Sequence, residues 1–205
     1  MKGFKTNRPK KLDLVLCTPA TQGKARSLAD LANEYQIVLT DEDRDVLGDL
    51  PKLYEAPVGA VHCAVEAKAC MTEHMKARPR LYDELNSSQQ TIHGATDVAI
   101  AVGFVMVNVA TTYVSPGRMG TPSVHRQPDV TARVIEKLKE LPRRTSTGEE
   151  GFDALAIAVV DCRNDGTTRV RLVDEPPAPS PGDIFHYDLM IHRLAHLYAS
   201  RFPLI

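Results

Sequence analysis

The stretch VGAVHCAVEAKAC, residues 58–70, alternates in polarity as a β-strand does. Successive side chains of a strand point to opposite faces of its sheet, so one face of this segment is entirely apolar. That face consists of Val61, Cys63, Val65, Ala67 and Ala69. The opposite face carries Glu66 and Lys68, which must therefore point the same way. Two opposite charges on a strand are costly to bury unless they have a partner or a function.

The tripeptide Glu66-Ala67-Lys68, an E-x-K motif, has two interpretations. As a surface ion pair at a strand end it would contribute roughly 0–1 kcal/mol to stability. As a site, its carboxylate could hold a metal ion while its ammonium group handles the proton of a water molecule. The motif is common by chance. Here, however, it ends a strand rich in Val and Ala and precedes a segment dense in charge, so both interpretations stay open.

Composition indicates an ordinary soluble protein. Of 205 residues, 43% are hydrophobic and 25% are charged, which suits one domain with a substantial core. A membrane span needs a run of about 18 apolar residues, and the sequence contains none. Residues 1–11 are basic but lack the apolar core of a signal peptide. The four cysteines form no C-x-x-C pair, which favours reduced thiols and a cytoplasmic location.

The formal net charge of −1 argues against a protein covered in positive charge for non-specific nucleic-acid binding. A local patch of basic residues is still compatible with this net charge. Basic residues cluster in residues 2–11, 74–80 and 137–144, and each cluster could also be a solvated face.

Before the E-x-K strand, residues 12–17 (LDLVLC) predict a short strand with Asp13 near its start. Helices are expected over residues 23–35 and 41–50, the second capped by Thr40 with Asp43 at the capping-box position. We expect these helices to form an insertion, about residues 20–52, between the Asp13 strand and the E-x-K strand.

After the motif, Pro79 predicts a turn followed by a helix over residues 79–88. Residues 97–108 are nearly all apolar, as in a central strand covered on both faces. A Gly/Pro-rich loop, a helix over 129–141 and a strand over 154–162 follow. The last elements expected are a paired strand over 169–173 and a helix capped by Asp183. The whole chain, 1–205, is interpreted as a single domain with a C-terminal hairpin and helix at 153–202.

An Asp near one strand start, then a strand ending in E-x-K, a helix and a buried strand, resembles the PD-(D/E)xK nuclease superfamily. The resemblance covers about residues 12–108, and residues 66–94 are also similar to an uncharacterised bacterial and phage group of this type. It implies an α/β fold with a restriction-endonuclease-like core: a mixed central sheet flanked by helices, with the helical insertion described above.

The resemblance also implies site residues. Asp13 and Glu66 would bind the metal ion together with the backbone carbonyl of Ala67, and Lys68 would orient or deprotonate the attacking water. The ion would be Mg²⁺, with Mn²⁺ as a substitute, because one or two carboxylates suffice for a hard cation that keeps several waters. Such an ion lowers the pKa of its water and neutralises charge in the transition state.

The sequence departs from the family pattern in two respects. Leu12 stands where a proline usually precedes the Asp, and 53 residues separate Asp13 from Glu66. Asp49 is only 17 residues before Glu66, a more usual spacing, but is expected at a helix end. Asp13 is favoured and Asp49 stays an alternative. The absence of a Q-x-x-x-Y motif after Lys68 argues against the RecB-like exonuclease branch.

Further residues are weaker candidates. Those that could face the site are His62, Glu73, His74 and Gln90. Those that could contact DNA are Lys10, Lys11, Lys76, Arg78, Arg80, Arg118, His125 and Arg126.

The function expected is that of a Mg²⁺-dependent endonuclease acting on double-stranded DNA in restriction or defence, with a homodimer suited to cutting both strands. A non-catalytic nucleic-acid-binding or assembly module that keeps the fold is the alternative from another class. A repair or structure-specific nuclease is a third possibility.

Overall fold

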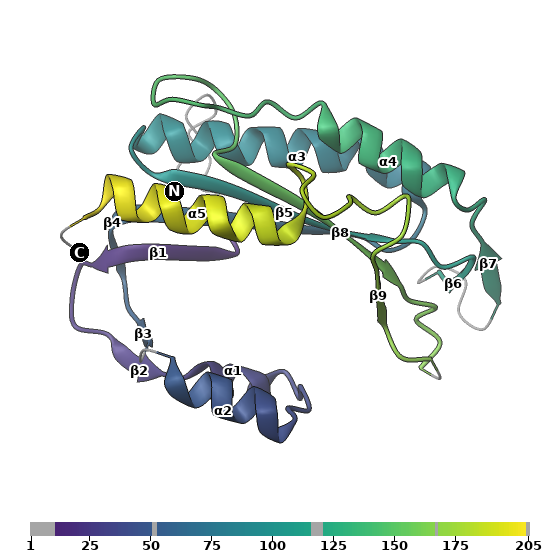
Figure 1. Ribbon diagram of the computed structural model, residues 1–205, viewed down its shortest axis with the longest axis horizontal. Coiled ribbons are helices and arrows are strands. Elements are labelled where there is room, and N and C mark those ends of the chain that lie inside the picture. Colours follow the sequence, from purple (N-terminus) through teal and green to yellow (C-terminus); the bar gives the residue numbers. More distant parts are fainter. Residues whose placement is uncertain (1–10, 51–52, 116–120, 167, 204–205) are drawn as a thin grey trace. The chain divides into compact units, whose positions relative to one another are not determined.

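The computed structural model describes residues 11–50, 53–115, 121–166 and 168–203 (Figure 1). The chain divides into two compact units. One is Cys17–Val61, and the other consists of the chain before Cys17 together with His62 and everything after it. The division coincides with the interval between Asp13 and the E-x-K motif.

A five-stranded sheet organises the larger part of the chain. Its strand order is β1-β4-β5-β8-β9. The strands are β1 (Leu14–Pro19), β4 (Val58–Cys70), β5 (Ile100–Asn108), β8 (Ala154–Asp161) and β9 (Arg171–Val173). β4, β5 and β8 are parallel, whereas β9 runs antiparallel to β8. The expected α/β class with a mixed central sheet is confirmed, and the restriction-endonuclease-like assignment stays a prediction.

Helices supply the crossovers that parallel strands require. α3 (His74–Ala95) links β4 to β5, and α4 (Asp129–Lys139) lies between β5 and β8 in sequence. These two helices contact each other and β5. α5 (Tyr187–Arg201) packs against β5 and β8 on the other face of the sheet (Figure 1). A small antiparallel pair, β6 (Thr112–Val114) with β7 (Pro122–Val124), follows β5, and β7 lies within residues 115–129, the segment expected to be a loop.

The apolar core beneath α5 is built from alternate strand positions. Its buried members are Cys63, Ile100, Val102, Ala154, Ala156 and Met190. Val65 and Phe104 pack against the same cluster. Residues between these positions, including Glu66, therefore face the side of α3 and α4.

Two helix predictions were wrong at their starts. α3 begins at His74 and contains Pro79 in its interior, so the predicted break at Pro79 does not occur. Burial of Leu81, Leu85 and Ile92 along one stripe outweighs the lost backbone hydrogen bond. α5 begins at Tyr187 with His186 as its N-cap, because Asp183 instead accepts a hydrogen bond from the Phe185 amide.

The unit Cys17–Val61 combines a short sheet with two helices. β2 (Lys24–Arg26) pairs antiparallel with β3 (Leu53–Glu55), and α1 (Leu28–Glu34) contacts α2 (Asp41–Asp49). The first expected helix is thus a strand followed by a shorter helix. The capping box predicted for α2 is confirmed, since the Thr40 hydroxyl accepts from the Asp43 amide at 3.1 Å.

Among the residues that the structure describes, no helix combines the length and apolar character needed to cross a membrane.

Gly103 in the middle of β5 is a position where a side chain does not fit. A Cβ atom there would lie 2.5 Å from Cδ1 of Leu155, a fully buried residue of β8. We expect Gly103→Ala to lower the free energy of unfolding by about 1–3 kcal/mol, as overpacking does. Gly48 in α2 is the matched control, because no atom of the described residues lies within 4 Å of its added Cβ and alanine favours a helix. Urea unfolding followed by circular dichroism measures both, and an unchanged Gly103→Ala midpoint would contradict the prediction.

Candidate functional site

Glu66 and Lys68 meet on the α3 face of β4, as strand alternation predicts. Lys68 Nζ lies 2.5 Å from Glu66 Oε1. The Glu66 side chain is only 3% exposed and the Lys68 side chain 24%, so this pair is not a solvated surface contact. In register, Glu66 lies beside Gly103 of β5. The charge of Glu84 in α3 acts on Lys68, so the pair lies on the side of the sheet that carries α3.

Asp13 joins this pair from the neighbouring strand. It immediately precedes β1, which lies next to β4 in the sheet. Its Oδ2 accepts a hydrogen bond from the Ala67 amide at 2.7 Å and lies 4.0 Å from Lys68 Nζ. The structure thus brings together Asp13, Glu66, Ala67 and Lys68. Asp49, the alternative first carboxylate, is the exposed last residue of α2 in the unit Cys17–Val61.

The pKa of Lys68 lies above its ordinary value. Burial lowers this pKa, but the hydrogen bond and negative charge of Glu66 and the charges of Asp13 and Glu84 raise it by more. Lys68 is therefore an ammonium group at neutral pH. In this state it can orient a water molecule or stabilise a negative charge, whereas accepting a proton would require a change in its surroundings.

One oxygen of Glu66, Oε2, is buried and makes no hydrogen bond to any residue that the structure describes. Buried carboxylate oxygens are normally satisfied. The described residues contain no group of three or more His, Cys, Asp and Glu side chains placed to hold a metal ion. A hard cation here would thus rely on Asp13 and Glu66, a backbone carbonyl, water and substrate oxygens, which is the sort of ligand set that Mg²⁺ uses. The free Oε2 fits that requirement.

Glu84 of α3 was not among the predicted site residues. Its charge acts on Lys68, and its Oε1 accepts a hydrogen bond from Arg80 Nε at 2.6 Å. Its spacing in the helix could have indicated this position. Glu84 lies three residues after the buried Leu81, and residues three apart are neighbours on the same face of a helix. The long α3 thus supplies a carboxylate near the motif.

The weaker site candidates lie in different surroundings. His62 stacks on Phe202, and its Nδ1 lies 3.2 Å from the hydroxyl of Tyr198 in α5. Glu73 is exposed and forms an ion pair with Lys76, and Gln90 is half-buried on α3.

His74 is buried at the start of α3, where its Nε2 lies 2.7 Å from the Asn108 carbonyl. Asn108 in turn uses its side chain to bind the backbone of Met71 and Cys162. His74 therefore anchors α3 to the ends of β5 and β8. Because it is buried, His74 has a structural role and is not placed to contact a substrate.

Burial lowers the pKa of His74 to about 4, and the neighbouring His125 ring lowers it too. The unfolded chain binds a proton near pH 6.5, so stability is fully present above that pH and falls as pH drops toward 4. We expect a loss of about 2–3 kcal/mol from this residue over that window. Urea unfolding at several pH values measures it. His74→Gln should make the pH dependence of stability shallower by about that amount, whereas the exposed His192→Gln should not. A profile unchanged by His74→Gln would contradict the assignment.

The candidate DNA contacts divide into exposed and buried groups. Lys11, Lys76, Arg80 and Arg126 are exposed, and Arg78 is half-buried. His125 is buried, with its ring between His74 and Tyr113 at centroid distances of 4.3 and 4.1 Å. Lys10 and Arg118 lie outside the described residues. Three of these basic residues, Lys76, Arg78 and Arg80, lie in the first two turns of α3, before Glu84 of the same helix.

No protein-family model, curated protein or solved structure matches this chain.

Proposed function

We propose that this chain is a Mg²⁺-dependent DNA endonuclease that hydrolyses phosphodiester bonds and leaves 5′-phosphate ends. One observation carries the proposal. Asp13, 54 residues away from Ala67 in sequence, accepts the amide hydrogen of the E-x-K motif and approaches Lys68 Nζ, beside a buried Glu66 oxygen that has no hydrogen-bond partner among the described residues. A chance ion pair does not require a second carboxylate hydrogen-bonded to the strand backbone.

In this function Asp13 and Glu66 would hold Mg²⁺ together with the Ala67 carbonyl. When bound, the ion would lower the pKa of a water ligand and neutralise charge on the phosphate. The chain's own contribution is the Lys68 ammonium, which orients the water and stabilises the negative charge that develops on the phosphate oxygens. The exposed Lys76 and Arg80 at the start of α3 would contact the phosphate backbone of double-stranded DNA. Cutting both strands would be served by a homodimer.

A non-catalytic nucleic-acid-binding module is the second candidate. The observation that favours it is the 2.5 Å ion pair, because Lys68 occupies one of the Glu66 oxygens that a metal ion would use. In such a module the E-x-K pair would stabilise the strand end and no hydrolysis would follow.

Incubation of plasmid and phage DNA with the intact protein separates the two candidates. The endonuclease predicts discrete fragments with Mg²⁺ or Mn²⁺ and none with EDTA, and end-labelling should show 5′-phosphates. DNA binding without cleavage under all these conditions would favour the module.

Manganese binding tests the ligand assignment without relying on activity. We expect Asp13→Asn to weaken Mn²⁺ binding at least about tenfold, because the substitution removes one of two carboxylates from the site. Asp49→Asn is the matched control and should leave binding unchanged. The paramagnetic resonance signal of free Mn²⁺ measures both affinities. The reverse pattern would show that Asp49 is the first carboxylate.

A further inference from the structure

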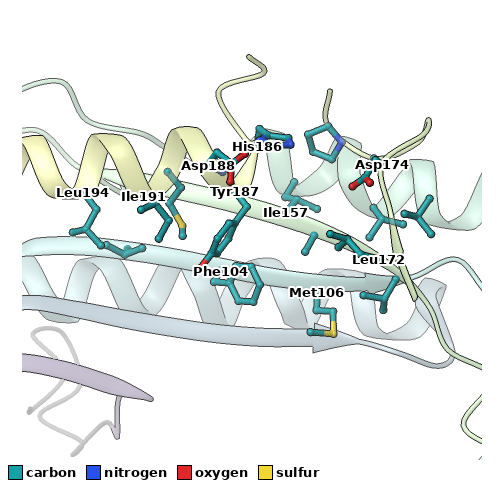
Figure 2. A pocket seen from close by; sticks show the side chains of 18 of the residues that line it. Phe104, Met106, Ile157, Leu172, Asp174, His186, Tyr187, Asp188, Ile191 and Leu194 are labelled. Atoms are coloured by element: carbon teal, nitrogen blue, oxygen red, sulfur yellow. Dashed lines mark hydrogen bonds and ion pairs between the residues drawn. The ribbon is translucent and has the colours of Figure 1, made fainter. Parts of the chain in front are cut away.

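A cavity of about 680 Å³ lies on the α5 side of the five-stranded sheet (Figure 2). Phe104, Met106 and Ile157 of the central strands contribute to its lining, together with Leu172 of β9 and Tyr187 and Ile191 of α5. The Tyr187 ring approaches Phe104 edge-on at a centroid distance of 5.8 Å. Volume and apolar lining are those of sites for small organic ligands, which are typically about 300–1,000 Å³.

This cavity is separate from the E-x-K site. Val65 belongs to its lining, and the adjacent Glu66 points to the opposite face of the sheet because strand side chains alternate. A molecule bound in the cavity would therefore not contact Glu66 or Lys68.

The cavity has an acidic rim. Asp188 in the first turn of α5 and Asp174 just after β9 both contribute carboxylates, and Figure 2 shows them on the same side of the apolar floor formed by Phe104 and Met106. His186 accepts the Asp188 amide hydrogen through Nδ1, and the same nitrogen lies 3.7 Å from Asp188 Oδ2. Of the described residues that line the cavity, none is Lys or Arg. The positive end of the α5 dipole offsets only part of two negative charges.

Apolar side chains around the cavity are left exposed to water. Leu172 is 60% exposed, Tyr187 48% and Ile191 41%. Contiguous exposed apolar surface rimmed by polar residues marks binding sites in soluble proteins. An apolar floor with an acidic rim favours a ligand that has an apolar body and a positively charged end.

We propose that this cavity binds a small amphiphilic cation, with its apolar body against Phe104, Met106 and Leu172 and its ammonium head beside Asp174 and Asp188. The head forms charge-assisted contacts that a neutral or anionic head of the same length cannot make. The affinity of the body follows from the apolar area that it removes from water.

Decylammonium and decanoate, which share an alkyl tail and differ in the charge of the head, are the probes. Each is titrated below its micelle concentration into the intact protein with ¹³C-labelled methionine methyl groups. Met106 lines the cavity, whereas Met75 is an exposed residue of α3 and reports non-specific binding. We expect saturable shifts at Met106 but not at Met75, with decylammonium at least about tenfold tighter.

Two variants test the two parts of the site. Asp174→Asn combined with Asp188→Asn should remove the preference for the cation and retain weak binding of both probes. Leu172→Gln should weaken both probes and leave the preference. Equal affinities in the intact protein, or shifts at Met75 that match those at Met106, would overturn the proposal. So would failure of both probes to bind, including the case in which light scattering shows that a second copy of the chain covers this face.

Discussion

Lys68→Ala is expected to lower Mg²⁺-dependent DNA cleavage by about 10²–10⁴-fold, and Glu66→Gln by at least as much. Loss of one charged group that stabilises a transition state costs about 10²–10³ in rate, and loss of a metal-binding carboxylate adds the metal's contribution. Both residues are held in one ion pair at 2.5 Å, so neither variant leaves the site's electrostatics intact. Cleavage rates on one plasmid at fixed protein and Mg²⁺ concentrations measure the effect.

The matched controls are Lys76→Ala and Glu73→Gln. These residues form an exposed ion pair at 3.1 Å just before and within the first turn of α3. Neutralising them repeats the charge changes at Lys68 and Glu66 away from the motif. We expect changes of a few-fold at most, with a weaker salt dependence for Lys76→Ala because it removes one phosphate contact. Cleavage that survives both Lys68→Ala and Glu66→Gln would show that the activity lies elsewhere and would contradict the assignment of these two residues to the site.

Asp153→Ala is expected to cost about 3–5 kcal/mol of stability, a larger loss than that expected for Gly103→Ala. Asp153 is 1% exposed and lies just before β8. Its Oδ1 accepts hydrogen bonds from Arg144 at 2.9 Å and Arg201 at 2.7 Å, and its Oδ2 accepts the Ala101 amide at 2.8 Å. The Arg144 side chain is fully buried, so removal of Asp153 leaves it with only its contacts to residues 97 and 99.

Asp161→Ala is the control at the other end of the same strand. Its ion pair with Arg171 spans 3.5 Å, and the Arg171 side chain is 73% exposed, so we expect a change of about 0–1 kcal/mol. Urea denaturation followed by circular dichroism compares the two variants. Equal, small losses would mean that the buried network around Asp153 does not hold α5 and the loop before β8 onto the sheet.

Patterns with a short period were read correctly from the sequence. The alternation of residues 58–70 is a strand in which Glu66 and Lys68 share a face. The apolar run 97–108 is the central strand β5, and Thr40 caps α2 as its spacing with Asp43 indicates. Each of these features depends on neighbours within a few residues, where side-chain periodicity and local hydrogen bonding dominate.

Features that depend on distant partners were missed. Pro79 suggested a break that burial of the α3 stripe overrides, and Asp183 suggested a cap although its carboxylate pairs with Lys139 of α4. Glu84 lies within the predicted helix, but only the fold brings its charge close enough to act on Lys68. The Arg144–Asp153 network joins residues whose roles no local pattern marks.

The sequence by itself determined the E-x-K strand and the shared face of Glu66 and Lys68, because side-chain alternation in a strand is a local property. It did not determine the surroundings of His62, which was expected on the Glu66 face but contacts Tyr198 and Phe202. Only the tertiary structure decided that Asp13 reaches the motif, since β1 and β4 are adjacent in the sheet although 53 residues separate Asp13 from Glu66. It also decided which charges are buried, which of them raise the pKa of Lys68, and where the apolar cavity opens. These properties arise from packing between segments that are distant in sequence, so they cannot be predicted from any short stretch alone.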